Sequence, residues 1–338
     1  MTLAGARQRT ADEIAKVLHV KGNTIHSQFS EFLADVTAYA PDVTLDVANR
    51  LYVEKTYDIL DEYLSALRIS YNTTIVPVDF NCGAEAARLA INAWVEEATK
   101  SKIRELLPFG EVDSDCVLIL VNAIYFKGLW EEQFKPEATT LKEFHVSKGA
   151  AKKVHMMYKQ AEFKVNIECG DLNATAVEIP YKGGKTSMVI ILPREVNGLP
   201  HLEAALTPSK LSDIFVGLET AVVELSLPRF RVDLSVNIKN VLQSMGVQDL
   251  FSHNADLSGI GGAKDLVVSA AFHKSFVEVN EEGTEAAAAT AVVKKKKKKR
   301  IISVTEFVVD HPFIFIIKCS DQDVILFAGS VRDIPCEK

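Results

Sequence analysis

The residues most able to do chemistry lie together near the carboxyl end of this 338-residue chain. Seven consecutive basic residues occupy positions 294–300, preceded by an acidic stretch with one glycine at 281–285 and small residues at 286–291. The basic residues repel one another, so this run should be extended and solvated. Three interpretations suit it: a flexible loop or nuclear-import patch, a cleavage site that attracts trypsin-like proteases (a bait), or a protruding basic segment that binds polyanions. The bait is the sharpest hypothesis, because the trypsin specificity pocket holds an acidic group that pairs with Lys or Arg.

The sequence has no motif of an enzyme or of a metal site. GxSxG, HExxH, GxxxxGK[ST] and GxGxxG do not occur, and the eight histidines show neither HxH nor HxxxH spacing. The five cysteines are odd in number and far apart, which predicts mostly buried free thiols. We therefore expect a protein that is not an enzyme and needs no cofactor. The cysteines are Cys82, Cys116, Cys169, Cys319 and Cys336.

The charge of the chain is unevenly distributed. The formal net charge is −7, and it would be −14 without the seven basic residues at 294–300. Nucleic-acid binding through the body of the protein is therefore not expected, since that needs basic charge spread over a face. No apolar run approaches the ~18 residues of a membrane span. The first residues also show no charged-then-apolar leader, so no signal peptide is visible.

The elements that must position the 281–300 segment follow an α+β order. A capping box at Thr10 to Glu13 predicts a helix that ends near Val20. Alternation predicts a strand at 43–47. Strand patterns dominate after residue 115, and one domain is the simpler interpretation. Further helices are expected at 25–36, 57–67, 84–106 and 234–244, and strands at 116–126, 187–192, 221–227, 266–279 and three places within 301–331.

Several motifs carry a resemblance to one family. The segment 278–290, EVNEEGTEAAAAT, resembles the hinge of the reactive loop of a serpin, and it is close to the clade that lacks classical signal peptides. The segment 122–130, NAIYFKGLW, resembles the NxIYFKGxW strand of that family. LPRF at 227–230 and FVVDHPFIFII at 307–317 are similar to two more of its signatures. The resemblance covers essentially the whole chain.

The resemblance implies a fold and a mechanism. It implies one serpin domain over 1–338, with three β-sheets, surrounding helices and an exposed reactive-centre loop at about 281–303. A protease would cleave this loop and become acylated, and the hinge would then insert as a strand into the main sheet and distort the protease. The implied partner is a trypsin-like serine protease held in a covalent complex by a monomeric inhibitor, with no membrane involved.

The resemblance also assigns residues. The inward-facing side chains of an inserted hinge would be small or apolar, which favours an inhibitor. Asn122 and His273 match a polar pair that holds the central strands, and Trp130 matches a tryptophan under the point where insertion begins. The hinge comprises Glu281, Glu282, Gly283, Thr284, Glu285, Ala286, Ala287, Ala288, Ala289 and Thr290.

Two counts place the cleaved bond differently. Fifteen residues counted from Gly283 give Lys297-Lys298, whereas counting back from His311 gives Lys299-Arg300. The alternative class of function is a non-inhibitory serpin whose basic loop binds a polyanion such as heparin or nucleic acid. That polyanion would contact Lys294, Lys295, Lys296, Lys297, Lys298, Lys299 and Arg300.

Two further expectations concern the amino terminus and the cellular location. Compared with the family, the first helix and most of the second have no counterpart, so we expect an amino-terminally incomplete serpin domain. Sequons at Asn72 and Asn173 are candidate N-glycosylation sites. Arthropod serpins with such hinges are often secreted, and a polybasic bait suits extracellular proteases. We expect an extracellular protein, with the cytoplasm as the alternative.

Overall fold

The computed structural model describes residues 1–22, 24–284, 304–320 and 324–335. The chain forms two compact units, which are described separately. Unit 1 comprises residues 1–40, 45–126 and 233–276, and unit 2 comprises 41–44, 127–232 and 277–338. Within the described residues the order of elements mixes helices and strands, which confirms the predicted α+β class.

Unit 1 contains most of a six-stranded sheet. Its strands are β1 (Val43–Glu54), β2 (Ile75–Val78), β3 (Leu118–Leu129), β9 (Phe230–Asn237) and β10 (Val268–Val279). The strand order is β2-β1-β3-β11-β10-β9, where β11 (Gly283–Thr284) belongs to unit 2. Within unit 1, β3 and β10 pair directly and run parallel, with Asn122 opposite His273.

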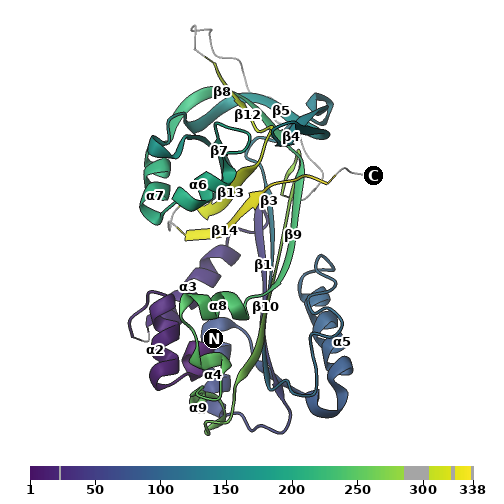
Figure 1. The fold of residues 1–338 in the computed structure, drawn as a ribbon, viewed down its shortest axis with the longest axis vertical. Coiled ribbons are helices and arrows are strands. Elements are labelled where there is room, and N and C mark those ends of the chain that lie inside the picture. Colours follow the sequence, from purple (N-terminus) through teal and green to yellow (C-terminus); the bar gives the residue numbers. More distant parts are fainter. Residues whose placement is uncertain (23, 285–303, 321–323, 336–338) are drawn as a thin grey trace. The chain divides into compact units, whose positions relative to one another are not determined.

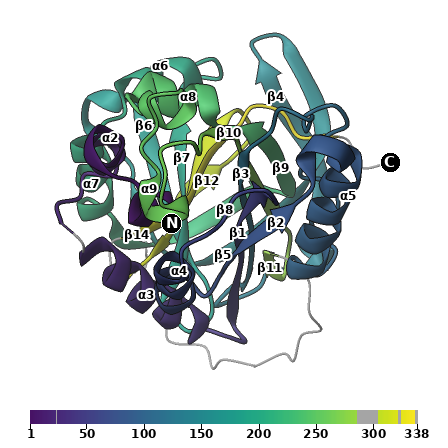
Figure 2. The same cartoon turned by 90° about the horizontal axis from the view of Figure 1, so that it is seen from below.

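Helices cover both faces of this sheet, which has parallel pairs at β1–β2 and β3–β10. On one face, α5 (Phe80–Ala98) buries Ile91 and Val95 against strand residues such as Val121 and Phe272 (Figures 1 and 2). The opposite face forms a second apolar cluster with other helices. These are α1 (Thr2–Gly5), α2 (Gln8–Val17), α4 (Asp61–Tyr71), α8 (Lys239–Met245), α9 (Ser258–Gly261) and the 3-10 helix η3 (Asp249–Phe251). The remaining helix, α3 (Thr24–Thr37), packs on α4, where Phe29 contacts Tyr71.

Unit 2 is built on an eight-stranded sheet with the order β12-β8-β5-β6-β7-β13-β14, and β4 pairs with β5. Its helices are α6 (Leu199–Ala205), α7 (Pro208–Val216) and the 3-10 helices η1 (Pro136–Ala138) and η2 (Gly170–Leu172). The strands are β4 (Thr140–Ser147), β5 (Ala150–Asn166), β6 (Ala174–Pro180), β7 (Thr186–Pro193), β8 (Glu219–Pro228), β12 (Thr305–Val308), β13 (Phe313–Cys319) and β14 (Val324–Val331).

Where three sheets were expected, the described strands form two hydrogen-bonded networks. The reason is the length of β5, which has 17 residues. Its first half pairs with β4 and its last residues pair with β6, while β8 pairs along ten of its positions. One uninterrupted strand therefore joins regions that would otherwise count as separate sheets.

Several local predictions differ from the structure; the helix expected at 57–67, for example, is α4, which begins only at Asp61. The helix expected after Thr10 is α2, which starts at Gln8, and the Thr10 hydroxyl instead accepts a hydrogen bond from the main-chain N–H of Asp256 (2.9 Å). The helix expected to reach residue 106 ends at Ala98. The segment 234–244 begins as the end of β9, and α8 starts only at Lys239. In each case tertiary contacts decide the boundary, because the apolar spacing reports burial and not the helix end.

Candidate functional site

The last two described residues of the predicted hinge, Gly283 and Thr284, form the short strand β11. β11 lies between β3 and β10 within unit 2, antiparallel to both. Gly283 is opposite Leu129, and Thr284 is opposite Gly128 on one side and Val279 on the other. We call Glu281, Glu282, Gly283 and Thr284, together with the side chains around them, the hinge site.

Gly283 is at a position that only glycine fits. Its φ is +146°, a conformation that L side chains rarely adopt. A Cβ atom there would also be 2.0 Å from the carbonyl oxygen of Gly128 and 2.7 Å from Cα of Leu129. The close approach of two main chains therefore depends on this glycine.

Thr284 is fully buried and has a specific partner. It is 0% exposed, and its hydroxyl is 2.9 Å from the hydroxyl of Tyr181. Tyr181 stacks on Trp130, with ring centroids 4.6 Å apart and planes 7° apart. The indole N–H of Trp130 donates to the carbonyl of Asn280 (2.9 Å). Burial raises the pKa of Tyr181, so its hydroxyl stays protonated at neutral pH.

An ion pair fixes the residue where the hinge begins. Both carboxylate oxygens of Glu281 accept from the guanidinium of Arg229 at 2.6–2.9 Å, and Thr139 donates a further hydrogen bond (2.5 Å). The Glu281 side chain is only 6% exposed. Burial by itself raises its pKa, but the hydrogen bonds from Arg229 and Thr139 outweigh burial and leave the pKa lowered.

The main chain on either side of Glu281 is also held. The amide of Phe134 donates to the carbonyl of Glu281 (2.9 Å), and the amide of Trp130 donates to the carbonyl of Glu282 (2.9 Å). The side chain of Glu281 and the main chain on either side of it together determine the path by which residues 281–284 reach the sheet.

A second polar group lies in unit 1, on the central strands. We call Asn49, Asn122 and His273 the strand-pair cluster. Nδ1 of His273 hydrogen-bonds Oδ1 of Asn122, whose amide Nδ2 donates to Oδ1 of Asn49 on β1. Burial lowers the pKa of His273, which favours the neutral imidazole. The three strands β1, β3 and β10 are thus linked by side chains as well as by their ladders.

The sequence comparisons decide the family. A family model described as "Serpin (serine protease inhibitor)" matches residues 1–334. The chain is a serpin.

Its relatives include named inhibitors. It is 53% identical to "Iris" of Ixodes ricinus over 335 residues, which covers 99% of this chain and 89% of that protein. It is 45% identical to "Leukocyte elastase inhibitor A" of Mus musculus, covering 98% and 89% respectively. Among solved structures, Serpin48, a highly specific serpin of the insect Tenebrio molitor, matches with a TM-score of 0.89 and 36% identity, covering 99% of this chain and 88% of that one. The serpin fold and membership in a family of serine protease inhibitors follow.

The structure brings some of the expected site residues together. Glu281, Gly283 and Thr284 share the hinge site with Trp130, and Asn122 contacts His273. The remaining hinge residues 285–290, the candidate bonds at 297–300 and the rest of the basic run lie outside the described residues.

The partners of these residues that escaped the sequence analysis include Tyr181, Arg229 and Asn49. Arg229 belongs to the LPRF motif, so the sequence singled out this residue. The motif does not indicate that Arg229 pairs with Glu281. Tyr181 and Asn49 carry no motif, and only the folded structure shows their contacts.

The two sequons are both accessible. Asn72 follows the last residue of α4 and Asn173 follows η2, and both are exposed and left-handed, with φ of 48° and 47°. Asparagine tolerates this conformation better than most residues. Exposure is compatible with glycosylation at either site.

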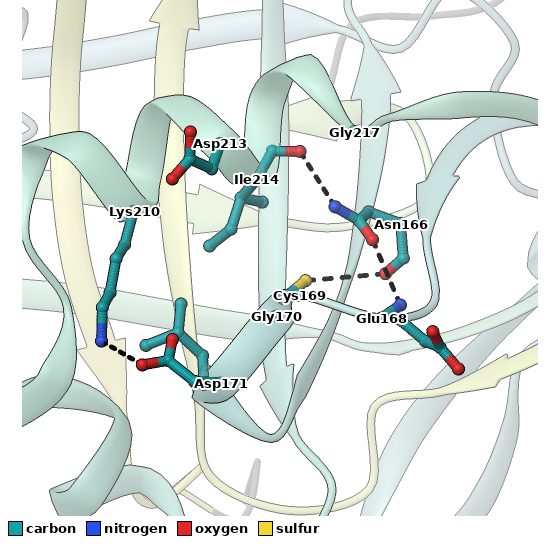
Figure 3. Close-up of a pocket in the computed structure, with 10 residues that line it drawn as sticks. Asn166, Glu168, Cys169, Gly170, Asp171, Lys210, Asp213, Ile214 and Gly217 are labelled. Carbon is teal, nitrogen blue, oxygen red and sulfur yellow. Dashed lines mark hydrogen bonds and ion pairs between the residues drawn. The ribbon is translucent and has the colours of Figure 1, made fainter.

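A pocket of about 300 Å³ beside α7 offers no reactive group (Figure 3). Lys210 pairs with Asp171 (2.8 Å), and Asn166 donates to the carbonyl of Ile214 (3.3 Å). Burial raises the pKa of the Cys169 thiol to about 11, so it stays protonated. The described Cys116, Cys169 and Cys319 are buried and not in a disulfide, as predicted, whereas Cys82 is exposed.

Within the part of the chain that the structure describes, no group of three or more His, Cys, Asp or Glu side chains is arranged to hold a metal ion. No helix among the same residues is long and apolar enough to cross a membrane.

Proposed function

We propose that this serpin inhibits trypsin-like serine proteases as a suicide substrate. The observation that carries the proposal is β11: the hinge has already entered between β3 and β10 at Gly283 and Thr284. Bait residues of the basic run, Lys297-Lys298 or Lys299-Arg300, supply the lysyl or arginyl side chain that such proteases recognise.

The chemistry follows from the bait. The protease serine attacks the carbonyl carbon of Lys297, or of Lys299, and the amine of the next residue leaves with a proton from the protease histidine. An ester then joins the two proteins. Water would normally hydrolyse this ester, and insertion of the hinge must occur first for the protease to be trapped.

The direction of β11 suits continued insertion. It is antiparallel to both neighbours, so the residues that follow Thr284 would continue between β3 and β10 and replace their parallel pairing with two antiparallel ladders. Strand side chains alternate, so Ala286, Ala288 and Thr290 would share the buried face of Thr284. Their small size costs little to bury.

Mixing the chain with trypsin tests the proposal. We expect an adduct that survives denaturing electrophoresis, and intact mass measurement of the released carboxy-terminal peptide identifies the cleaved bond. Cleavage without an adduct would mean that the chain is only a substrate. Chymotrypsin, which does not accept basic residues, is the control protease and should give no adduct at this run.

A second candidate rests on the basic run itself: the seven charges at 294–300 would bind a polyanion such as heparin. Such binding should weaken steeply as salt rises, because it releases counterions. Retention on heparin that does not change between 50 and 500 mM salt would exclude it. A nuclear-import role would instead appear as altered distribution of a tagged protein whose run is replaced by Ser and Gly.

We also propose an extracellular, monomeric inhibitor that is glycosylated at Asn72, Asn173 or both. A polybasic bait suits secreted trypsin-like proteases, and both asparagines are exposed. Detection of the mature chain with N-glycans in secretions supports this location, and detection only in cytosol, without glycans, contradicts it.

A further inference from the structure

A second cavity, in unit 1, is lined by two arginines that have no anionic partner. It has a volume of about 290 Å³ and lies where β1, the end of α4 and α5 meet. We call it the arginine pocket. The residues that matter for the argument are Arg50, Arg68, Asn72, Thr73, Thr74 and Trp94.

The guanidinium of Arg50 is held in place by an aromatic ring instead of a carboxylate. Its Cζ lies 3.9 Å from the centroid of Trp94, a cation–π contact. Its Nε is buried without a well-formed hydrogen bond, and the polar neighbour of the guanidinium is the hydroxyl of Tyr52, whose pKa burial raises and the Arg50 charge lowers. Buried donors are nearly always paired, so an unpaired one next to a cavity calls for an explanation. The fixed ring contact also means that little side-chain entropy remains to be lost on binding.

Arg68 adds a second positive charge from the last turn of α4. Among the described residues, no ion pair or hydrogen bond joins either Arg50 or Arg68 to an acidic side chain. Other arginines of this unit do have such partners, for example Arg88 with Glu85 (2.7 Å). The charge in the pocket is therefore not neutralised from within.

Neighbouring negative groups are already satisfied. Asp46, just before the pocket residues of β1, pairs with Lys100 (2.9 Å). The carbonyl of Leu67 near the end of α4 accepts from the amides of Asn72 and Thr73. An incoming anion would thus meet two guanidiniums, and no carboxylate is among the residues that line the pocket.

We propose that the arginine pocket binds the oxyanion of a phosphate or sulfate monoester. Guanidinium groups match the tetrahedral oxyanion with two-pronged hydrogen bonds, and the Asn72 side-chain amide lies at the same wall. The Thr73 and Thr74 hydroxyls already donate to the carbonyls of Asn49 and Ile75, so the anion is bound through the two arginines. The volume is at the small end of ligand pockets, which suits one such group on a single sugar or a free ion and not a polymer.

The sequon bears directly on this site, because Asn72 lines the pocket. An N-glycan there would cover the entrance. The anion site is therefore a property of the chain without a glycan at Asn72, and the binding experiment uses protein made in bacteria, which do not attach one.

Calorimetry of the full chain with glucose 6-sulfate, inorganic sulfate and glucose tests the site at low salt. We expect saturable binding of one anion and no binding of glucose. Arg50→Gln and Arg68→Gln should each weaken binding about tenfold, since each removes a charge-assisted contact. Arg104→Gln is the matched control: this arginine is exposed and does not line the pocket, so affinity should stay within about twofold of the native value.

All variants keep the basic run at 294–300, so the non-specific contribution of this run to anion binding is the same in each. Emission of Trp94 should also change on binding in the native chain and not in Arg50→Gln, because the ring contacts that guanidinium. If Arg50→Gln does not fold, two other variants still test the site. Arg50→Lys keeps the charge and removes the two-pronged geometry. Arg68→Gln changes an exposed residue, so the fold should tolerate it. Equal weakening in Arg104→Gln, or no binding of either anion up to 20 mM, would overturn the proposal.

Discussion

The hinge site and the strand-pair cluster hold strands β3 and β10 in two different ways. In unit 2 the contacts depend on shape and on one ion pair: a glycine that admits no side chain, a buried threonine, and Glu281 bound to Arg229. In unit 1 they depend on neutral hydrogen bonds among His273 and two asparagines. The first is therefore sensitive to side-chain volume, and the second to the protonation of an imidazole.

The proposed insertion mechanism gives this difference a meaning. A shape-dependent contact at Gly283 and Thr284 would select which residues enter the sheet, and a titratable contact between the same two strands would set how readily they separate. The four predictions below alter one region at a time, so that each effect can be assigned.

The largest effect is expected from Thr284→Arg. A charged side chain cannot replace a threonine that is 0% exposed and contacts Tyr181. The adduct with trypsin should fall below detection on denaturing gels while cleavage of the loop continues. Thr140→Arg, the same change at an exposed threonine of unit 2, should leave the adduct intact. An undiminished adduct in Thr284→Arg would contradict the insertion account.

Gly283→Ala should destabilise the fold by about 3 kcal/mol, because main-chain strain and overlap with Gly128 add together. Gly149→Ala separates the two causes: its φ is +94°, but nothing lies within 4 Å of the added atom. Gly149→Ala should lower the free energy of unfolding by only about 1 kcal/mol. Urea unfolding measures both, and equal losses would mean that the close approach of main chains is unimportant.

Glu281→Gln should lower the free energy of unfolding at pH 7 by about 2 kcal/mol, between the values for surface and buried ion pairs. The pKa of Glu281 is lowered from its ordinary 4.5, so its contribution is complete above pH 4.5 and is lost as the pH falls through the folded value. The gap between native and variant should therefore shrink at pH 3. Glu137→Gln, at an exposed site, should show no comparable gap at either pH.

The smallest effect is expected in the strand-pair cluster. Burial lowers the pKa of His273 from its ordinary 6.5, so protons bind the unfolded chain more readily. Its contribution to stability is complete above about pH 6.5 and decreases as the pH falls below that value. His273→Gln should flatten the pH dependence of the unfolding midpoint between pH 7.5 and 5.5, whereas Glu281→Gln should not. A parallel shift of the whole curve would assign the titration to another group.

The hinge residues could be singled out from the sequence, whereas the residues that surround them in the fold could not. Gly283 and Thr284 belong to a local pattern whose chemistry can be read residue by residue. Tyr181 and Asn49 lie far from their partners along the chain, so nothing local indicates them. The helix boundary at Gln8 was missed for a related reason: the Thr10 hydroxyl contacts Asp256, 246 residues away, instead of capping its own helix.

The central claim is that β11 is the beginning of an insertion that cleavage completes. Thermal unfolding of the chain before and after cleavage in the 294–300 run tests it most directly, with the two fragments kept together. The account predicts a large rise in the unfolding temperature after cleavage, because a new strand replaces the direct pairing of β3 with β10 by two antiparallel ladders, and no such rise in Thr284→Arg. An unchanged or lower unfolding temperature after cleavage of the native chain would contradict it.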